Sequence, residues 1–335
     1  MNVLLTGGLG FIGFFVAKYL LEKGYNLILV DNINNYAGKI NVIFKNERLK
    51  ELQKIYNNTK KKNYFNFLKL DLTKDKDILV LEQEIKKISG IDITIHLAAY
   101  AGVKYSLKYP EKYIKNNIIA TQKLLNLVNK KDFISKNIIF SSTSSVYDGN
   151  PLPFKEENCI TNFLSPYSYT KFCCENILKT YHKIYNFNVV ILRYFTVFGP
   201  YNRPDMATFK FFYNLLKSKP IYINGKDISR DWTYVENTAI ATTNAINLFK
   251  NNNNIFEIIN IGSDNPIKVM DYVNLIFKVA NKETKIVIKD YNPYEMKSTW
   301  ADITKAKKLL NYNVDNNNLE YYLKKTFENL KKYIL

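Results

Sequence analysis

The sequence is poor in cysteine and histidine, and it contains no long apolar run. Its 335 residues include three cysteines and two histidines. Cys159, Cys173 and Cys174 give neither a disulfide framework nor the spacing of a metal site. His96 and His182 are isolated, and we assign neither a catalytic role. No apolar stretch approaches the length of a membrane span, and the first expected strand begins at residue 2. We therefore expect a cytoplasmic protein with no metal and no membrane partner.

Arginine is scarce although positive charge is abundant. The chain has 48 basic residues and a formal net charge of +18, yet only four residues are arginine. The lysines are spread along the whole chain, which indicates a compositional bias rather than a nucleic-acid patch, so we expect no nucleic-acid partner. In such a chain an arginine indicates a need for the planar fork that binds phosphate or carboxylate in two places. Arg193, Arg203 and Arg230 lie in the motifs described below, whereas Arg48 is predicted to be a solvated helix residue.

Only 12 glycines occur in the chain, and three of them follow the first expected strand at three-residue spacing. Gly7, Gly10 and Gly13 stand between an apolar strand at 2–6 and an apolar helix at 11–23. Glycines at such a turn permit close approach of a pyrophosphate, whose charge then meets the helix N-terminus. Asp31 ends the next strand, 18 residues after Gly13, where an acid binds the adenosine ribose and disfavours a 2′-phosphate. The alternative is a turn cluster that binds no ligand.

Two further motifs carry hydroxyl groups. Residues 141–145 read SSTSS directly after an apolar strand, at the strand end where open α/β sheets bind ligands. Tyr167 and Lys171 are four residues apart and share one face of an expected helix. An ammonium about 4 Å from the phenol favours the phenolate by roughly 4 kcal/mol at an effective dielectric of about 20. The pair is then a candidate general base. Alone, it could equally be a surface helix pair.

Alternating strands and helices predict an α/β fold with a Rossmann-like doubly wound parallel sheet. Residues 1–198 are expected to form this cofactor-binding domain, and residues 199–335 a smaller substrate-binding domain with some segments that return to the first. Expected strands lie at 2–6, 26–31, 64–69, 91–97, 137–141, 188–194, 221–223 and 258–261. Expected helices lie at 11–23, 40–57, 75–88, 110–130, 166–185, 205–217, 235–249, 268–280 and 318–333.

Taken together, these motifs make the whole chain similar to the extended short-chain dehydrogenase/reductases, the family of nucleotide-sugar epimerases and dehydratases. Within that family it most resembles the UDP-glucuronate 4-epimerases. The resemblance is also carried by HLAAYAGVKYS at 96–106, by Tyr113 and Asn117, by RYFTVFGP at 193–200, RPDMA at 203–207 and RDWTY at 230–234.

The resemblance implies tightly held NAD, a UDP-sugar substrate and a homodimer that pairs through the helices at 110–130 and 166–185. It implies that Asp71 reaches the adenine and that Asn117 and Phe195 lie near the nicotinamide. The implied cofactor-binding residues are Gly7, Gly10, Phe11, Ile12, Gly13, Asp31, Asn32, Asp71, Leu72, Leu97, Ala98, Ala99, Asn117, Tyr167, Lys171 and Phe195.

The reaction that the resemblance implies is reversible C4 epimerisation of UDP-glucuronate to UDP-galacturonate through a transient 4-keto sugar. Tyr167 would take the proton of the 4-hydroxyl group, and Thr143 would hydrogen-bond to the same group. Lys171 would lower the pKa of Tyr167 and hold the nicotinamide ribose. Because the cofactor is regenerated, no net redox change occurs.

The implied substrate residues are Lys104, Ser144, Ser145, Thr196, Arg203, Arg230 and Glu295. Related dehydratases and decarboxylases carry carboxylates where Ser144 and Ser145 stand, so the short hydroxyls favour epimerisation of an acid sugar. Three residues depart from the family pattern: Lys104, Asn202 and Glu295. These departures leave three alternatives open: a substrate that is an N-acetylated UDP-uronate, a substrate that is a neutral UDP-hexose, or the reaction of a UDP-glucuronate decarboxylase. A non-catalytic nucleotide sensor is disfavoured because the Thr, Tyr and Lys set is intact.

Overall fold

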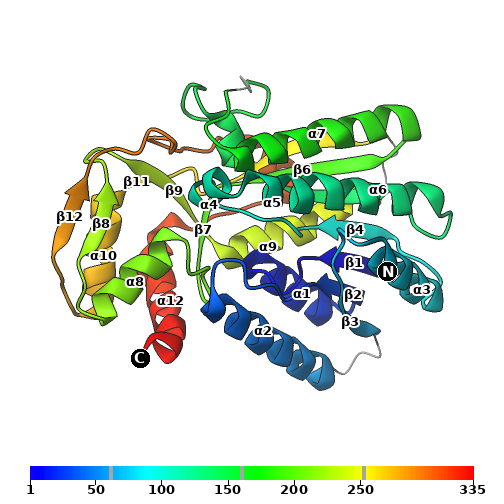
Figure 1. Ribbon diagram of the computed structural model, residues 1–335, viewed down its shortest axis with the longest axis horizontal. Coiled ribbons are helices and arrows are strands. Elements are labelled where there is room, and N and C mark those ends of the chain that lie inside the picture. Colours follow the sequence, from blue (N-terminus) through cyan, green and yellow to red (C-terminus); the bar gives the residue numbers. More distant parts are fainter. Residues whose placement is uncertain (60–62, 159–161, 251–253) are drawn as a thin grey trace.

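Seven parallel strands form the central sheet of the computed structural model, which describes all residues except 60–62, 159–161 and 251–253 (Figure 1). Cys159 therefore lies outside the described residues. The spatial order is β10-β6-β5-β4-β1-β2-β3, and each neighbouring pair runs parallel. This architecture confirms the expected Rossmann-like class. The strands are β1 (Asn2–Thr6), β2 (Asn26–Asp31), β3 (Phe65–Lys69), β4 (Ile93–His96), β5 (Asn137–Thr143), β6 (Asn188–Tyr194) and β10 (Phe256–Ile261).

Helices cover both faces of this sheet, which is why its strands are apolar on both sides. Val3 and Leu5 of β1 face one core, and Leu4 between them faces the other. On the first face α1 packs against α2 and α9, and on the second α6 packs against α3 and α7. The helices are α1 (Phe11–Lys23), α2 (Lys39–Asn58), α9 (Val235–Asn244), α3 (Asp75–Lys87), α6 (Ala120–Lys130) and α7 (Pro166–Tyr185).

Short helical segments follow β4 and β5 at the carboxyl edge of the sheet. The helix expected at 110–130 is interrupted by a π-helical turn, which brings Asn117 under the loop after β4. These segments are α4 (Val103–Lys108), α5 (Pro110–Tyr113), the π-turn η1 (Ile114–Ile119) and the 3₁₀ turn η2 (Ser144–Tyr147), whereas the 3₁₀ turn η3 (Ala245–Phe249) follows α9.

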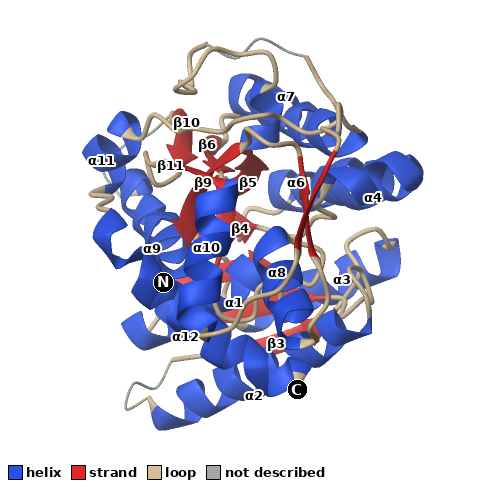
Figure 2. Cartoon of the chain, turned by 90° about the vertical axis from the view of Figure 1, so that its left-hand side faces the viewer, coloured by secondary structure: helices blue, strands red, loops and turns tan. Residues whose placement is uncertain are grey.

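Segments after residue 195 build a second group of elements at one end of the molecule, beyond the edge where β4, β5 and β6 finish (Figures 1 and 2). A three-stranded sheet, β11-β9-β7, continues from β6, and a two-stranded parallel sheet, β12-β8, lies farther out. The elements are β7 (Thr196–Phe198), α8 (Ala207–Leu216), β8 (Ile221–Asn224), β9 (Ser229–Tyr234), β11 (Pro266–Lys268), α10 (Val269–Ala280), β12 (Ile286–Lys289), the 3₁₀ turn η4 (Asn316–Asn318) and α12 (Leu319–Ile334). Like α9 and β10, α11 (Thr304–Leu310) returns to the first part of the molecule, where it packs against both of them.

The sequence patterns predicted the first half of the chain closely and the second half less well. The strands expected at 2–6, 26–31 and 188–194 and the helices expected at 11–23 and 166–185 have the observed bounds. The strand at 258–261 is part of β10, which joins the central sheet rather than a separate one. The patterns did not predict β7, β9, β11, β12, α4 or α11, because these elements are short and their partners are distant in sequence.

Candidate functional site

The glycine turn after β1 is shaped by close backbone contacts. Gly7 has a φ of 70°, and a Cβ placed there would lie 2.6 Å from the backbone nitrogen of Ala98. A Cβ at Gly13 would lie 2.2 Å from the carbonyl oxygen of Gly7. Side chains at these two positions would push β1, β4 and α1 apart. The turn thus leaves backbone exposed at the N-terminus of α1, which is the cradle that a pyrophosphate requires.

A cleft of about 100 Å³ runs from this turn across the ends of β1, β2 and β4. The lining of this cleft fits NAD. The glycine turn offers backbone N–H groups for the pyrophosphate, and the carboxylates of Asp31 and Asp71 offer acceptors for the adenosine. The predicted residues that line the cleft are Gly7, Gly10, Asp31, Asn32, Asp71, Leu72, Leu97, Ala98 and Ala99.

Other predicted cofactor residues lie beside the cleft rather than in its lining. Phe11 and Phe195 are buried in the main apolar core, against which Ile12 also packs. The neighbours of Asn117 on the same segment, Asn116 and Ala120, line the cleft in its place.

Asp31 is held by several protein groups at once. One carboxylate oxygen accepts a hydrogen bond from the backbone nitrogen of Ile33 at 2.8 Å, and the other accepts one from Leu9 at 3.3 Å. The ammonium of Lys45, on α2, lies 2.8 Å from the same carboxylate, and both side chains are buried. The acid at the end of β2 is therefore pre-oriented, and part of its charge is offset by a lysine that the motif analysis did not identify.

Arg48 is fully buried, which corrects its prediction as a solvated helix residue. Its guanidinium donates to the carbonyl oxygen of Leu9 at 2.7 Å and to that of Tyr201 at 2.6 Å. Burial lowers its pKa to about 9. Arg48 thus ties the glycine turn to the loop after β7, although its charge-rich sequence neighbourhood resembles that of an exposed helix.

Tyr167, near the start of α7, hydrogen-bonds to Thr143 at the end of β5, and Lys171 lies about one turn farther along the same helix. Ser165 caps α7 by accepting a hydrogen bond from the backbone nitrogen of Ser168 at 3.2 Å, so Tyr167 lies in the first turn. Burial raises the pKa of Tyr167, while a hydrogen bond with Thr143 and the charge of Arg203 oppose that rise. The expected lowering of this pKa by Lys171 is not what the structure shows.

Lys171 is 2 % exposed and faces into α7's contact with the sheet. Its ammonium lies over the ring of Phe140 on β5, 4.2 Å from the ring centre. Burial lowers the pKa of Lys171 to about 8, and Cys174 and Glu175 on the same helix oppose that shift. A lysine in this setting can still carry a proton near neutral pH, but its charge is costly to bury.

Asn117 holds the loop after β4 against α7. Its amide oxygen accepts from the backbone nitrogen of Tyr100 at 2.7 Å, and its amide nitrogen donates to the carbonyl oxygen of Tyr100 at 3.0 Å. The same nitrogen donates to the hydroxyl of Thr170 at 2.9 Å. Asn117 therefore fixes the spacing between the cofactor cleft and the helix of Tyr167.

A second cleft, of about 760 Å³, lies between the ends of β4 and β5 and the segments after residue 195. Cations and acids from both parts of the chain face it, together with serine and threonine hydroxyls. The predicted residues in its lining are Lys104, Ser144, Ser145, Thr196, Arg230 and Glu295, and additional charged residues are Lys108, Asp148, Asp205 and Lys210.

Arg203 faces its own neighbour in this structure. Its guanidinium forms two hydrogen bonds to Asp205, at 3.0 and 2.7 Å. It also lies 5.8 Å from the ring centre of Tyr36, whose hydroxyl is 3.3 Å from that of Tyr113. Arg203 is thus part of a tyrosine-rich wall next to Tyr167, and Asp205 and Tyr36 are residues of this wall that the motifs did not identify.

Lys104, on α4, and Glu295, in the segment after β12, approach each other across the second cleft. Their charged atoms are 3.4 Å apart, and Lys104 is the more exposed of the two. Arg230 donates to the carbonyl oxygens of Ser229 and Lys297, at 2.8 and 2.9 Å. Both contacts leave the charges at the cleft surface rather than in the core.

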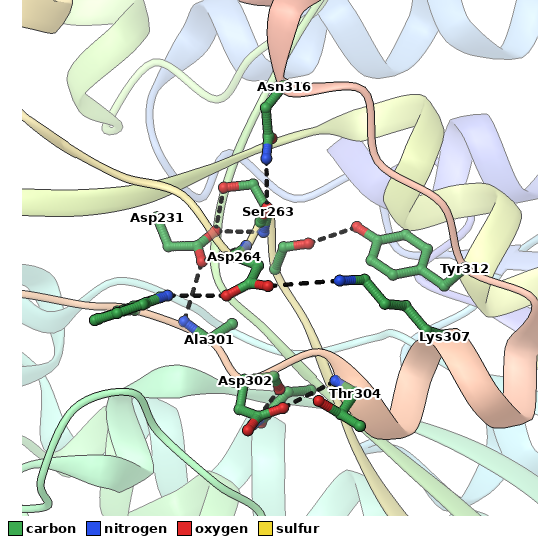
Figure 3. Close-up of polar contacts among 12 residues, drawn as sticks. Asp231, Ser263, Asp264, Ala301, Asp302, Thr304, Lys307, Tyr312 and Asn316 are labelled. Atoms are coloured by element: carbon green, nitrogen blue, oxygen red, sulfur yellow. Dashed lines mark hydrogen bonds and ion pairs between the residues drawn. The ribbon is translucent and has the colours of Figure 1, made fainter.

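Behind Arg230, the buried carboxylate of Asp231 joins three segments (Figure 3). It accepts from the backbone and hydroxyl of Ser263 at 2.6 and 2.9 Å, and from the backbone nitrogens of Asp264 and Ala301 at 3.1 Å each. Thr233 donates to it at 3.2 Å. Burial raises the pKa of Asp231, and these donors oppose that rise. Asp231 thereby connects β9 to the loop after β10 and to the segment at 299–301.

Within the described part of the chain, no set of three or more His, Cys, Asp and Glu side chains is arranged to hold a metal ion. Cys173 and Cys174 are free thiols, and Cys174 is buried. None of the described helices combines the length and apolar character needed to cross a membrane.

Comparison with known proteins places these two clefts in a family context. A family model described as the NAD dependent epimerase/dehydratase family matches residues 3–262. The chain is 38% identical over 311 residues to the UDP-glucuronate 4-epimerase of Thermodesulfobacterium geofontis (strain OPF15), a similarity that covers 92% of this chain and 90% of that protein.

Solved structures with the same architecture cover nearly the whole chain. The UDP-glucuronic acid 4-epimerase from Bacillus cereus, in complex with UDP-glucuronic acid and NAD, matches with a TM-score of 0.87 and 32% identity over 99% of this chain and 100% of that one. The UDP-N-acetylglucosamine 4-epimerase from Methanobrevibacter ruminantium M1, in complex with UDP-N-acetylmuramic acid, matches with a TM-score of 0.81 and 29% identity over 99% and 98%.

Proposed function

Because the chain belongs to the NAD-dependent epimerase/dehydratase family, we propose that it is an isomerase that interconverts UDP-glucuronate and UDP-galacturonate at C4. The observation that carries the proposal is the hydrogen bond between Tyr167 and Thr143, at the strand end whose next residues, Ser144 and Ser145, line the second cleft. The resemblance to proteins named as UDP-glucuronate 4-epimerases supports the choice of substrate.

In this proposal the glycine turn binds the pyrophosphate of NAD, Asp31 binds the adenosine ribose, and Asp71 lies toward the adenine. When bound, NAD supplies the hydride chemistry at C4 of the sugar. Tyr167 accepts the proton of the 4-hydroxyl group and later returns it. Thr143, which hydrogen-bonds to Tyr167, keeps the reacting oxygen beside the phenol. Because burial raises the pKa of Tyr167, a nearby positive charge must favour the phenolate during the reaction, and Lys171 and Arg203 are the candidates.

The second cleft supplies the substrate contacts. The hydroxyls of Ser144, Ser145 and Thr196 line it and can donate to a sugar carboxylate without acting as acid or base toward C5. Arg230 offers a planar donor for the diphosphate or uronate. None of these three positions holds an Asp or Glu, which disfavours decarboxylation and dehydration.

A second candidate substrate is an N-acetylated UDP-sugar. The similar Methanobrevibacter ruminantium structure holds UDP-N-acetylmuramic acid, and the cleft of about 760 Å³ in this chain has room for a substituent. Glu295 and Lys104 at its edge are the residues through which the preference would differ.

The test is incubation of the purified protein with UDP-glucuronate, followed by chromatography and proton NMR of the nucleotide sugars. We expect UDP-galacturonate to form up to an equilibrium mixture, with no carbon dioxide released and no added cofactor consumed. Formation of a UDP-pentose, or turnover confined to UDP-N-acetylglucosamine or another N-acetylated sugar, would contradict the proposal. The same assay run from UDP-galacturonate must reach the same mixture.

We also propose that the protein is a homodimer that pairs through α7 and the segments from α5 to α6. Apolar side chains are exposed along these helices, among them Ile114, Ile119, Tyr169, Ile184 and Tyr185. Light scattering is expected to give twice the chain mass, and a mass of one chain at micromolar concentration would contradict this.

A further inference from the structure

Glu175 is a buried acid to which the proposed reaction assigns no role. It follows Lys171 by four residues and Tyr167 by eight, so the three side chains share one face of α7. Its carboxylate accepts hydrogen bonds from Arg193, through Nε at 3.0 Å and Nη2 at 2.6 Å. It also accepts a short hydrogen bond from the hydroxyl of Ser142. One side chain thus connects α7 to both β5 and β6.

The strand residues that Glu175 contacts lie within three positions of proposed site residues. Ser142 precedes Thr143 at the end of β5, and Arg193 on β6 lies three residues before Thr196. The acid is 4 % exposed and its arginine partner 1 %, so water cannot replace either contact. Removing one partner of such a buried pair leaves an uncompensated charge, which is strongly unfavourable.

The charged groups around Lys171 are few among the described residues. His96 on β4 faces it, but burial and the lysine charge lower the pKa of that imidazole to about 3, so it is neutral. Burial raises the pKa of the Cys174 thiol to about 11, which keeps it neutral as well. Phe140 on β5 offers only a ring face. Cys174 and Glu175 both oppose the lowering of the Lys171 pKa, and Glu175 is the carboxylic acid of the two, one helical turn from Lys171 on the same face of α7.

We propose that Glu175 is a positioning residue for the reaction: it fixes the helix of Tyr167 to the strand of Thr143, and its charge keeps Lys171 protonated. This rests on the proposed function for the first part, since only turnover reports the alignment of Tyr167 with Thr143. The second part, the effect of Glu175 on the protonation of Lys171, can be tested on the protein without substrate. Glu175 touches no reacting atom, so it is not a catalytic residue.

The decisive variant is Glu175→Gln, which keeps the size of the side chain and removes its charge. In protein labelled with ¹³C at the lysine side chains, NMR titration gives the pKa of Lys171, and Lys171→Met identifies its resonance. We expect Glu175→Gln to lower that pKa by at least about one unit, because an opposite charge nearby shifts a pKa by about one to three. The alkaline limb of the kcat profile is expected to move to lower pH by the same amount. The control is Glu156→Gln, which removes an acid that accepts from the backbone of Asn260 and does not act on Lys171.

A folded Glu175→Gln protein with an unchanged Lys171 pKa would overturn the electrostatic part. The titration needs no nucleotide sugar, so this result is distinct from failure of the proposed reaction. If Glu175→Gln does not fold, Glu175→Asp and Ser142→Ala replace it. Glu175→Asp keeps the charge, so the Lys171 pKa is expected to stay within about half a unit of the wild-type value; a larger fall contradicts the proposal.

Ser142→Ala tests the positioning part, because it removes one contact between Glu175 and β5 and leaves every charge in place. We expect kcat to fall by about tenfold with KM and the pH profile unchanged, since a small misplacement of reacting groups is costly. A purely structural role would lower the unfolding temperature and leave kcat intact. Wild-type kcat in this variant would therefore overturn the positioning role.

Discussion

The two clefts are built in opposite ways. Around Tyr167, polar side chains are buried and each is held by several partners: Asn117 by three contacts, and Glu175 by Arg193 and Ser142. Around the second cleft, charged side chains lie on helices, loops and a short strand, and Lys104 in its ion pair keeps 57% of its side chain exposed.

The difference separates chemistry from selectivity. Proton transfer needs groups fixed to within a few tenths of an ångström, which a rigid buried network provides. Substrate choice can be carried by exposed residues, whose replacement costs little stability. Asp231 is the exception in the second region, because it is fully buried and held by several hydrogen bonds next to the half-buried Arg230. If the contrast is real, substitutions in the first region should act on kcat, and those in the second on KM.

The largest effect is expected for Tyr167→Phe, which removes the proposed base and keeps the ring. We expect kcat for UDP-glucuronate to fall by about 10²–10⁴-fold while KM changes little, as measured by product formation over time. The matched control is Tyr169→Phe on the same helix, whose ring is exposed, and it should keep wild-type kcat. A Tyr167→Phe enzyme within about threefold of wild type would disprove the assignment.

The next effect is the pH dependence that Lys171 brings to the buried region. Its pKa is lowered to about 8, so activity that needs the ammonium should decline as the pH rises through 8. Stability should move the other way. Because the unfolded lysine has a pKa of about 10.4, the unfolded state binds more protons between these two values, and stability rises with pH across that window by roughly 3 kcal/mol.

Comparison with Lys171→Met isolates this contribution from that of other lysines. The free energy of unfolding, measured by urea denaturation at pH 7, 8, 9 and 10, should increase for wild type relative to the variant as the pH rises. A difference that stays constant would mean that folding does not lower the pKa of Lys171, because both states would then bind the same number of protons across this range.

The buried region was also the easier one to predict from sequence. Gly7, Asp31 and Lys171 stand in local motifs, where spacing alone places them on a turn, a strand end and a helix face. The partners of these residues were not predictable in the same way. Arg48, Glu175 and Asp231 are buried, and their partners come from segments distant in sequence that no local motif identifies. For Arg48, the scarcity of arginine in the sequence indicated a specific role. The charge-rich helix around it nevertheless led to its prediction as a solvated residue.

Asp231→Asn should give the largest effect in the second region. The substitution turns one acceptor oxygen into a donor that faces the backbone nitrogens of Ser263, Asp264 or Ala301, so buried donors lose their partner. We expect a loss of stability of about 2 kcal/mol in urea denaturation, and a raised KM because β9, which carries Arg230, is less firmly held to the neighbouring segments. Asp264→Asn is the control, since this acid bonds to Trp300 at the surface. Unchanged stability and KM would show that the buried acid does not fasten the cleft wall.

The smallest effect is expected for the Lys104 and Glu295 pair, and it is the sharpest test of the contrast. An exposed pair with charged atoms 3.4 Å apart gains little, because water and salt screen it. In a double-mutant cycle of Lys104→Gln and Glu295→Gln, the coupling energy from KM values should stay below about 1 kcal/mol and shrink further in salt. Lys104→Arg should then alter the preference between UDP-sugars rather than kcat, because it exchanges a point charge for a fork. A coupling well above that limit, insensitive to salt, would mean that this edge of the cleft is as rigid as the surroundings of Tyr167. Selectivity would then have to come from the fixed framework, since no adaptable surface would remain to supply it.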